Sequence, residues 1–115
     1  MNAEDRDNDQ LGVILRYCER LEAAQTRFGS NYEVFARDEV FQDSCALCLI
    51  QIGEAVHRLS EEFCQAHPNI EWKLIYGMRC HLAHGYEIFD TEIAWDAITK
   101  EIAPLKAFCE ERYRG

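Results

Sequence analysis

Apolar residues recur at steps of three and four along most of this 115-residue chain, which is the spacing that gathers them on one face of an α-helix. The first such stretch predicts a helix that ends at Gly29-Ser30-Asn31, because glycine and small polar residues interrupt the pattern there. The apolar face of this helix consists of Leu11, Ile14, Cys18, Leu21 and Phe28.

The second stretch predicts a longer helix with two alternative starts. Ser30 and Glu33 have the spacing of a capping box, and Asp38 offers a later N-cap. We expect this helix to end before Pro68, because a proline pushes the residue before it out of helical geometry. Its apolar face consists of Phe41, Cys45, Cys48, Ile52, Ala55, Leu59 and Phe63.

A third helix is predicted after Pro68-Asn69, with Gly85 as its left-handed C-terminal cap. A fourth is predicted from near Asp90-Thr91, and Pro104 inside it should kink it or end it early. The apolar residues of these two helices are Ile70, Leu74, Met78 and Leu82, and then Trp95, Ile98, Ile102, Leu105 and Cys109.

The expected fold is therefore all-α. No segment alternates strictly enough to predict a strand, and four amphipathic helices with short connections are typical of an up-and-down four-helix bundle. The chain has the length of one ordinary domain, so we expect a single helical domain over residues 1–115.

Composition narrows the class of protein. Hydrophobic residues make up 48% and charged residues 29% of the chain, which is typical of a soluble globular protein. No apolar run approaches the roughly 20 residues that span a bilayer, and the acidic N-terminus lacks the apolar stretch of a secretion signal. We expect a cytoplasmic protein with no membrane partner.

The six cysteines raise the question of a metal site, since Cys45-x2-Cys48 and Cys64-x2-His67 imitate the spacing of zinc ligands. On one continuous helix the two pairs would lie roughly 28 Å apart and could not share a tetrahedral ion. The cysteines are better interpreted as small hydrophobic residues of the core. We expect no metal, no cofactor and, in the cytosol, no disulfide.

Net charge is −9, which at first argues against a nucleic-acid partner, because bulk acidity repels a polyanion. The longest segment without an acidic residue, however, runs from Trp72 to Tyr86 and contains Lys73, Arg79, His81 and His84. Such a segment is better able to bind RNA phosphates than the total charge suggests. An ordinary buried helix would explain the lack of acidic residues equally well.

The same segment carries a motif, Arg79-x4-His84-x-Tyr86. Ile52-Gly53-Glu54-Ala55 precedes it on the second helix, Trp72 comes shortly before it, and an acidic segment with a tryptophan, Asp90 to Trp95, follows it. Together these elements resemble the HepT-type toxins of the HEPN superfamily, and the resemblance spans the chain from the first helix to Leu105. One position departs from the family pattern: Cys80 stands where a polar residue, commonly asparagine, is usual.

The resemblance implies a toxin of the HEPN/MNT toxin–antitoxin type, a metal-independent endoribonuclease that cleaves RNA such as tRNA or mRNA, and not DNA. Arg79 and His84 would be catalytic, with Cys80 and His81 as possible supporting residues. HEPN proteins are similar to one another in pairing two motif helices across a homodimer cleft, so a homodimer is expected. In such pairs the antitoxin is a minimal nucleotidyltransferase that transfers AMP to the motif tyrosine, here Tyr86.

The residue types suit this chemistry. Histidine exchanges protons near neutral pH, and arginine presents a permanently charged fork to phosphate. Five positions on a regular helix separate two side chains by about 140°, so Arg79 and His84 can converge only if the backbone departs at Gly85. One role open to Glu54 is to hold the motif helix through a hydrogen bond, whereas His57 and His67 gain no role from the resemblance. A different class stays open, a non-catalytic HEPN subunit of a nucleotidyltransferase complex, which Cys80 and the acidic charge favour.

Overall fold

The computed structural model describes residues 2–83 and 90–115, with the backbone alone at 80, 81 and 83. Its elements are α1 (Ala3–Phe28), α2 (Tyr32–Arg37), α3 (Glu39–Arg58), α4 (Glu61–Ala66), α5 (Trp72–Ala83), α6 (Thr91–Asp96), the π-helical segment η1 (Ala97–Glu101) and α7 (Ile102–Arg112). The described part of the chain contains no strand, so the predicted all-α class is confirmed. None of its helices is long and apolar enough to cross a membrane.

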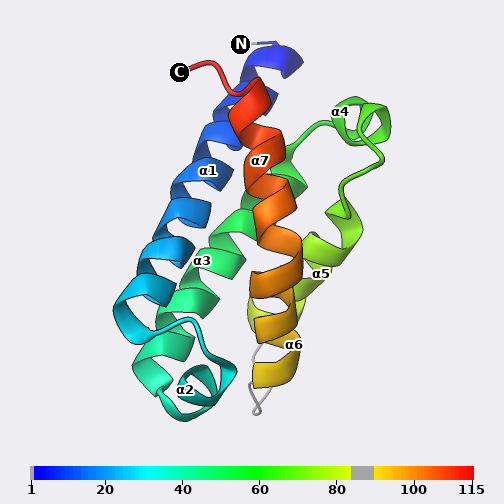
Figure 1. Ribbon diagram of the computed structural model, residues 1–115. Helices are drawn as coiled ribbons and strands as arrows, with labels where there is room; N and C mark the ends of the chain where they lie inside the picture. The colour runs from blue at the N-terminus through cyan, green and yellow to red at the C-terminus, as the bar shows by residue number, and fades with distance from the viewer. Residues whose placement is uncertain (1, 84–89) are drawn as a thin grey trace.

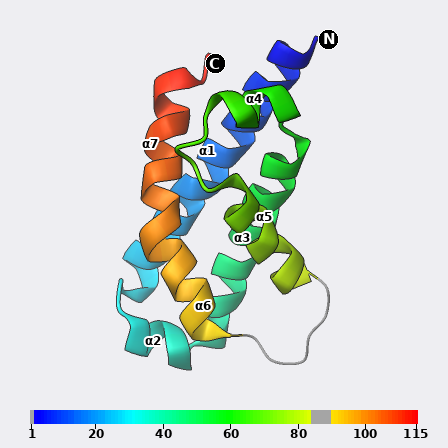
Figure 2. The ribbon, with the colours of Figure 1, turned by 90° about the vertical axis from the view of Figure 1, so that its right-hand side faces the viewer.

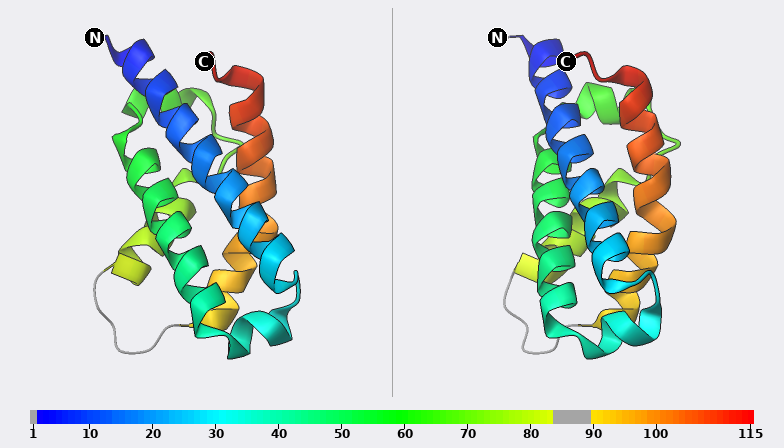
Figure 3. Two further views of the ribbon diagram at one scale, coloured as in Figure 1. Left: turned by 90° about the vertical axis from the view of Figure 1, so that its left-hand side faces the viewer. Right: turned by 60° about the vertical axis from the view of Figure 1, so that its left-hand side comes forward.

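Four helical rods form the bundle: α1, α3, α5, and the nearly continuous rod made by α6, η1 and α7 (Figures 1 and 2). Helix α3 lies between α1 and α5 and packs on both (Figure 1), while α7 packs on α1 (Figure 3). Successive rods alternate in direction, as the sequence predicts, and both chain termini lie at the same end of the bundle (Figure 1).

Local polar side chains decide where the long helix begins. The Asp38 side chain accepts hydrogen bonds from the backbone amides of Val40 and Phe41, at 3.0 and 3.2 Å, so Asp38 caps α3. Of the two starts that the sequence left open, the structure has the one at Asp38. The alternative start at Ser30 is not used, because Asn31 caps the short helix α2, with its Oδ1 2.8 Å from the amide of Glu33.

The long helix ends earlier than predicted, at Arg58 instead of near Pro68. Ser60 interrupts it, because its hydroxyl caps α4 by accepting from the amide of Phe63 at 3.2 Å. The Ser60 amide and hydroxyl each donate to the buried carboxylate of Asp7 in α1, both at 2.7 Å. A contact distant in sequence therefore turns the chain away from α3.

Because of this break, the two zinc-like pairs lie on different helices, Cys45 and Cys48 on α3 and Cys64 and His67 at α4. The described residues contain no group of three or more His, Cys, Asp or Glu side chains that could hold a metal ion. Burial raises the pKa of three core thiols to about 12, those of Cys18, Cys45 and Cys109.

Helix α5 meets the core with Met78 and Leu82, as predicted, but not with Leu74. Trp72 and Ile75 are buried, whereas Leu74 is 52% exposed. Adjacent helical positions differ by about 100° in direction, so a helix that turns Ile75 toward α3 must turn Leu74 outward. The indole Nε1 of Trp72 donates to the carbonyl of His67 at 2.9 Å and anchors the start of α5.

The last rod begins at Thr91, as predicted, and Asp90 is its N-cap. Pro104 does not end it, because the helix continues to Arg112, and the predicted early end is wrong. Proline lacks the amide that would donate to the carbonyl of Lys100 in a regular α-helix. The wider π-helical turns of η1 fall directly before this point, which keeps the rod continuous.

Candidate functional site

Arg79 lies in the second half of α5, on the side that faces α3. The two helices come close together at Gly53: a Cβ added there would overlap the Cβ of Arg79 and lie 2.9 Å from its Cγ. Only glycine fits at this contact without a shift of one helix. The Ile52-Gly53-Glu54-Ala55 segment thus sets how near α3 stands to the arginine.

The next residue of that segment, Glu54, forms an ion pair with Arg79 through its Oε1 and the arginine Nε. Both side chains are mostly covered, with exposed fractions of 20% for Arg79 and 26% for Glu54. The other carboxylate oxygen of Glu54 lies 3.7 Å from Nη2 of Arg58, whose side chain is 59% exposed. Glu54 therefore fixes the guanidinium of Arg79 from α3, the role that the sequence left open for it.

An aromatic pair stands beside this ion pair. The imidazole of His57 in α3 stacks on the Tyr76 ring of α5, with centroids 4.4 Å apart and an interplanar angle of 12°. The guanidinium carbon of Arg79 lies 6.0 Å from the centroid of the same Tyr76 ring. Sequence reasoning gave His57 no role, because its contact with Tyr76 depends on how α3 and α5 are rotated about their axes, which the sequence does not show.

The structure places only part of the predicted site. Arg79 is brought together with Glu54 and with the Tyr76 ring. Cys80 and His81 belong to the last turns of α5, described by their backbone. His84, Tyr86 and the predicted cap Gly85 lie outside the described residues.

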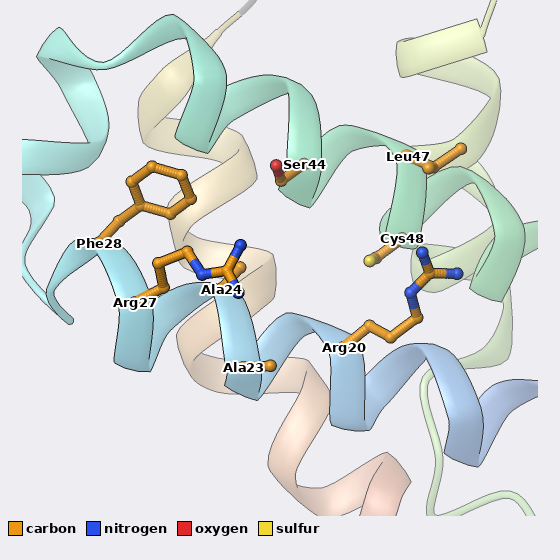
Figure 4. Close-up of a pocket in the computed structure, with 8 residues that line it drawn as sticks. All are labelled: Arg20, Ala23, Ala24, Arg27, Phe28, Ser44, Leu47 and Cys48. Atoms are coloured by element: carbon orange, nitrogen blue, oxygen red, sulfur yellow. The ribbon is translucent and has the colours of Figure 1, made fainter.

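A separate hollow of about 340 Å³ lies between α1 and α3 (Figure 4). Arg20 and Arg27 reach over it from α1, and Ser44 and Cys48 face it from α3 (Figure 4). Burial raises the pKa of the Cys48 thiol, and the nearby Arg20 guanidinium partly offsets that rise. None of the residues that line this hollow belongs to α5, so it is not part of the motif site.

The all-α bundle is consistent with a HEPN-like helical protein. The chain matches the family model described as "Ribonuclease HepT-like" over residues 14–112, and it belongs to that HepT-like ribonuclease family.

Curated relatives agree with this assignment. The chain is 38% identical over 101 residues, 88% of either protein, to a protein of Caldanaerobacter subterraneus subsp. tengcongensis named "Putative RNase". It is 31% identical over 80 residues, 70% of this chain and 73% of the relative, to "Probable ribonuclease HepT" of Thermococcus cleftensis. A further "Putative RNase", from Methanocaldococcus jannaschii, is 32% identical over 76 residues, 66% of each protein. No solved structure gives a significant match.

Proposed function

We propose that this protein is a metal-independent endoribonuclease that cleaves RNA and acts as the toxin of a HEPN/MNT toxin–antitoxin pair in the cytoplasm. The observation that carries the proposal is the ion pair from Glu54, which holds Arg79 toward α3, five residues before His84. Membership of a ribonuclease family supports RNA as the substrate.

In this mechanism His84 takes the proton of a ribose 2′-hydroxyl, and the 2′-oxygen attacks the adjacent phosphorus. The bond from phosphorus to the 5′-oxygen breaks, and that oxygen receives a proton from a second histidine. The products are a 2′,3′-cyclic phosphate and a 5′-hydroxyl, and DNA is excluded because it has no 2′-hydroxyl. Arg79 offsets the charge that builds on the non-bridging phosphate oxygens.

The second histidine requires a second copy of the chain. One His84 cannot easily act as base and acid in the same step, so we propose a homodimer whose two motif helices face one cleft. Each copy then contributes one Arg79 and one His84. Holding Arg79 before substrate arrives lowers the cost of ordering that side chain in the transition state.

Tyr86 is the proposed site of control. A minimal nucleotidyltransferase antitoxin transfers AMP from ATP to its hydroxyl: the tyrosine oxygen attacks the α-phosphorus, the hydroxyl proton is lost and pyrophosphate leaves. The bulky anionic adduct then blocks the cleft and repels RNA phosphates. Intact-mass measurement after co-expression with such a partner tests this step. We expect one added AMP on the wild-type chain and none on a Tyr86→Phe variant.

A second candidate, a non-catalytic subunit of a nucleotidyltransferase complex, is favoured by Cys80 at a usually polar position and by the net charge of −9. Expression without a partner separates the two functions. An active toxin suppresses growth, and Arg79→Ala or His84→Ala should restore growth. Arg27→Ala removes the same charge outside the motif site and should not restore growth. Equal tolerance of the wild type and all three variants would favour the binding subunit.

A further inference from the structure

The stacked pair of His57 and Tyr76 is not explained by the proposed catalytic roles. The Tyr76 ring is half-buried and packs against the core, while His57 is exposed on the outer turn of α3. One face of the imidazole is covered by Tyr76 at a centroid distance of 4.4 Å. Because the residue as a whole is exposed, the accessible part of the imidazole lies on the side that Tyr76 does not cover.

The position of this pair relates it to the motif arginine. His57 lies three residues after Glu54, and Tyr76 three residues before Arg79, so each pair shares one side of its helix. Tyr76 is common to both contacts, since its ring meets the imidazole on one side and lies 6.0 Å from the Arg79 guanidinium carbon. An aromatic platform and a phosphate-binding cation thus stand next to each other across α3 and α5.

We propose that His57 and Tyr76 form a nucleobase subsite for single-stranded RNA. The base of one nucleotide stacks on the outer face of His57 and continues the Tyr76–His57 stack, while Arg79 takes the neighbouring phosphodiester. Aromatic and imidazole rings bind unpaired bases in this way, and duplex bases are not open to such contact. The subsite rests on the proposed ribonuclease function and adds to it a preference for unpaired RNA.

Its test is binding, measured apart from cleavage. Fluorescence anisotropy is recorded in EDTA with a 2′-O-methyl RNA oligomer, which cannot react, and with matched oligomers that carry one abasic nucleotide. The variants are His57→Ala and His57→Phe. Tyr113→Ala is the matched control, because it removes another exposed aromatic ring, from a residue near the C-terminus that is 39% exposed. Thermal melting checks that each variant is folded.

We expect His57→Ala to weaken binding of the intact oligomer about 5- to 150-fold, the range for one lost base stack. His57→Phe and Tyr113→Ala should stay near the wild type. An abasic nucleotide at the stacked position should weaken oligomer binding by the wild type by a similar factor. It should leave oligomer binding by His57→Ala unchanged. Three results would overturn the subsite. The first is a wild-type affinity in His57→Ala, and the second is a wild type that does not bind the oligomer. The third is a His57→Phe variant that binds as weakly as His57→Ala.

Failure of the subsite and failure of the ribonuclease function give different results. If the wild type binds through the stack but cleaves no RNA, the catalytic proposal fails and the subsite stands. If it cleaves RNA through His84 while His57→Ala binds and cleaves with unchanged KM, the subsite fails and the catalytic proposal stands.

Discussion

Gly53 of α3 lies directly against Arg79 of α5, with no room between them for even one methyl group. The residue that follows, Glu54, forms the ion pair with the same arginine. One contact therefore serves two purposes: it sets the spacing of the two helices and brings a carboxylate to the guanidinium. The position of Arg79 depends on α3 as much as on its own helix.

Gly53→Ala should disturb both the fold and the site. The added methyl group overlaps Arg79, and overpacking a buried contact costs typically about 1–3 kcal/mol of unfolding free energy. Urea unfolding should show this loss together with strongly reduced RNA cleavage. Gly77→Ala is the matched control on α5, because an added Cβ there meets nothing within 4 Å. It should raise stability by about 0.5–1 kcal/mol, and equal stability of the two variants would contradict the packing argument.

Glu54→Gln should lower kcat more than it raises KM. It keeps the shape of the side chain but removes the charge that orients Arg79, so the transition-state contact suffers more than ground-state binding. We expect kcat to fall about tenfold, as measured by steady-state cleavage of a fluorogenic RNA. The control is Glu33→Gln, the same change in an ion pair with Arg37 in which the glutamate is 75% and the arginine 82% exposed. An unchanged kcat in Glu54→Gln would show that the catalytic position of Arg79 does not depend on the charge of Glu54.

Much of the fold could be predicted because helix ends are set by neighbouring residues. Gly29 ends α1 with a positive φ of 105°, and Asp38 and Asp90 cap α3 and α6 through their own side chains. The break after Arg58 could not be predicted, because it depends on Asp7, whose partner Ser60 is 53 positions away in the sequence.

The candidate site also has a part that the sequence predicts and a part that it does not. Arg79 and Glu54 follow from motif spacing, while the stack of His57 on Tyr76 depends on how α3 and α5 are rotated about their axes. The close contact of Gly53 with Arg79 is one point of the packing between these helices. The exposed Leu74 shows the same limit, since periodicity within α5 did not reveal which of two adjacent faces meets α3.

Ser60→Ala should destabilise the protein without changing the site. It removes the cap of α4 and one of the two hydrogen bonds to the buried Asp7 carboxylate, and a lost hydrogen bond to a charged group costs about 1.5–3 kcal/mol. Urea unfolding measures the effect. Ser30→Ala, at an exposed serine with one 3.4 Å contact to Gln25, should change stability by less than about 0.5 kcal/mol. Similar losses in both variants would argue against the Asp7–Ser60 anchor.

The core thiols should make stability depend on alkaline pH. Burial raises the pKa of Cys18, Cys45 and Cys109 from 9.0 to about 12. Between these values the unfolded thiols lose their protons while the folded ones keep them, so unfolding free energy should fall as pH rises above 9. Well below pH 9 these groups contribute no slope, because the thiols are protonated in both the folded and the unfolded state. Urea titrations from pH 8 to 11 measure this, and Cys18→Ala should reduce the slope. An unfolding free energy that stays constant between pH 9 and 11 would contradict this prediction.

The same burial predicts selective alkylation. Iodoacetamide at pH 8 should leave Cys18, Cys45 and Cys109 unmodified in the native protein, because the thiolate is the reacting form. All three should be modified in urea. Peptide mass spectrometry distinguishes the sites, and rapid native labelling of any of the three would show that this part of the core opens readily.

Cleavage of total RNA and purified tRNA in EDTA tests the central claim most directly, with the wild type, Arg79→Ala and His84→Ala compared as folded proteins free of AMP on Tyr86. Arg27→Ala, an arginine of α1 outside the motif site, is the charge-matched control. We expect the wild type and Arg27→Ala to cleave RNA to 2′,3′-cyclic phosphate ends, and the two motif variants to lose at least about a hundredfold in rate. Absence of cleavage by the wild type, or equal cleavage by His84→Ala, would contradict the account.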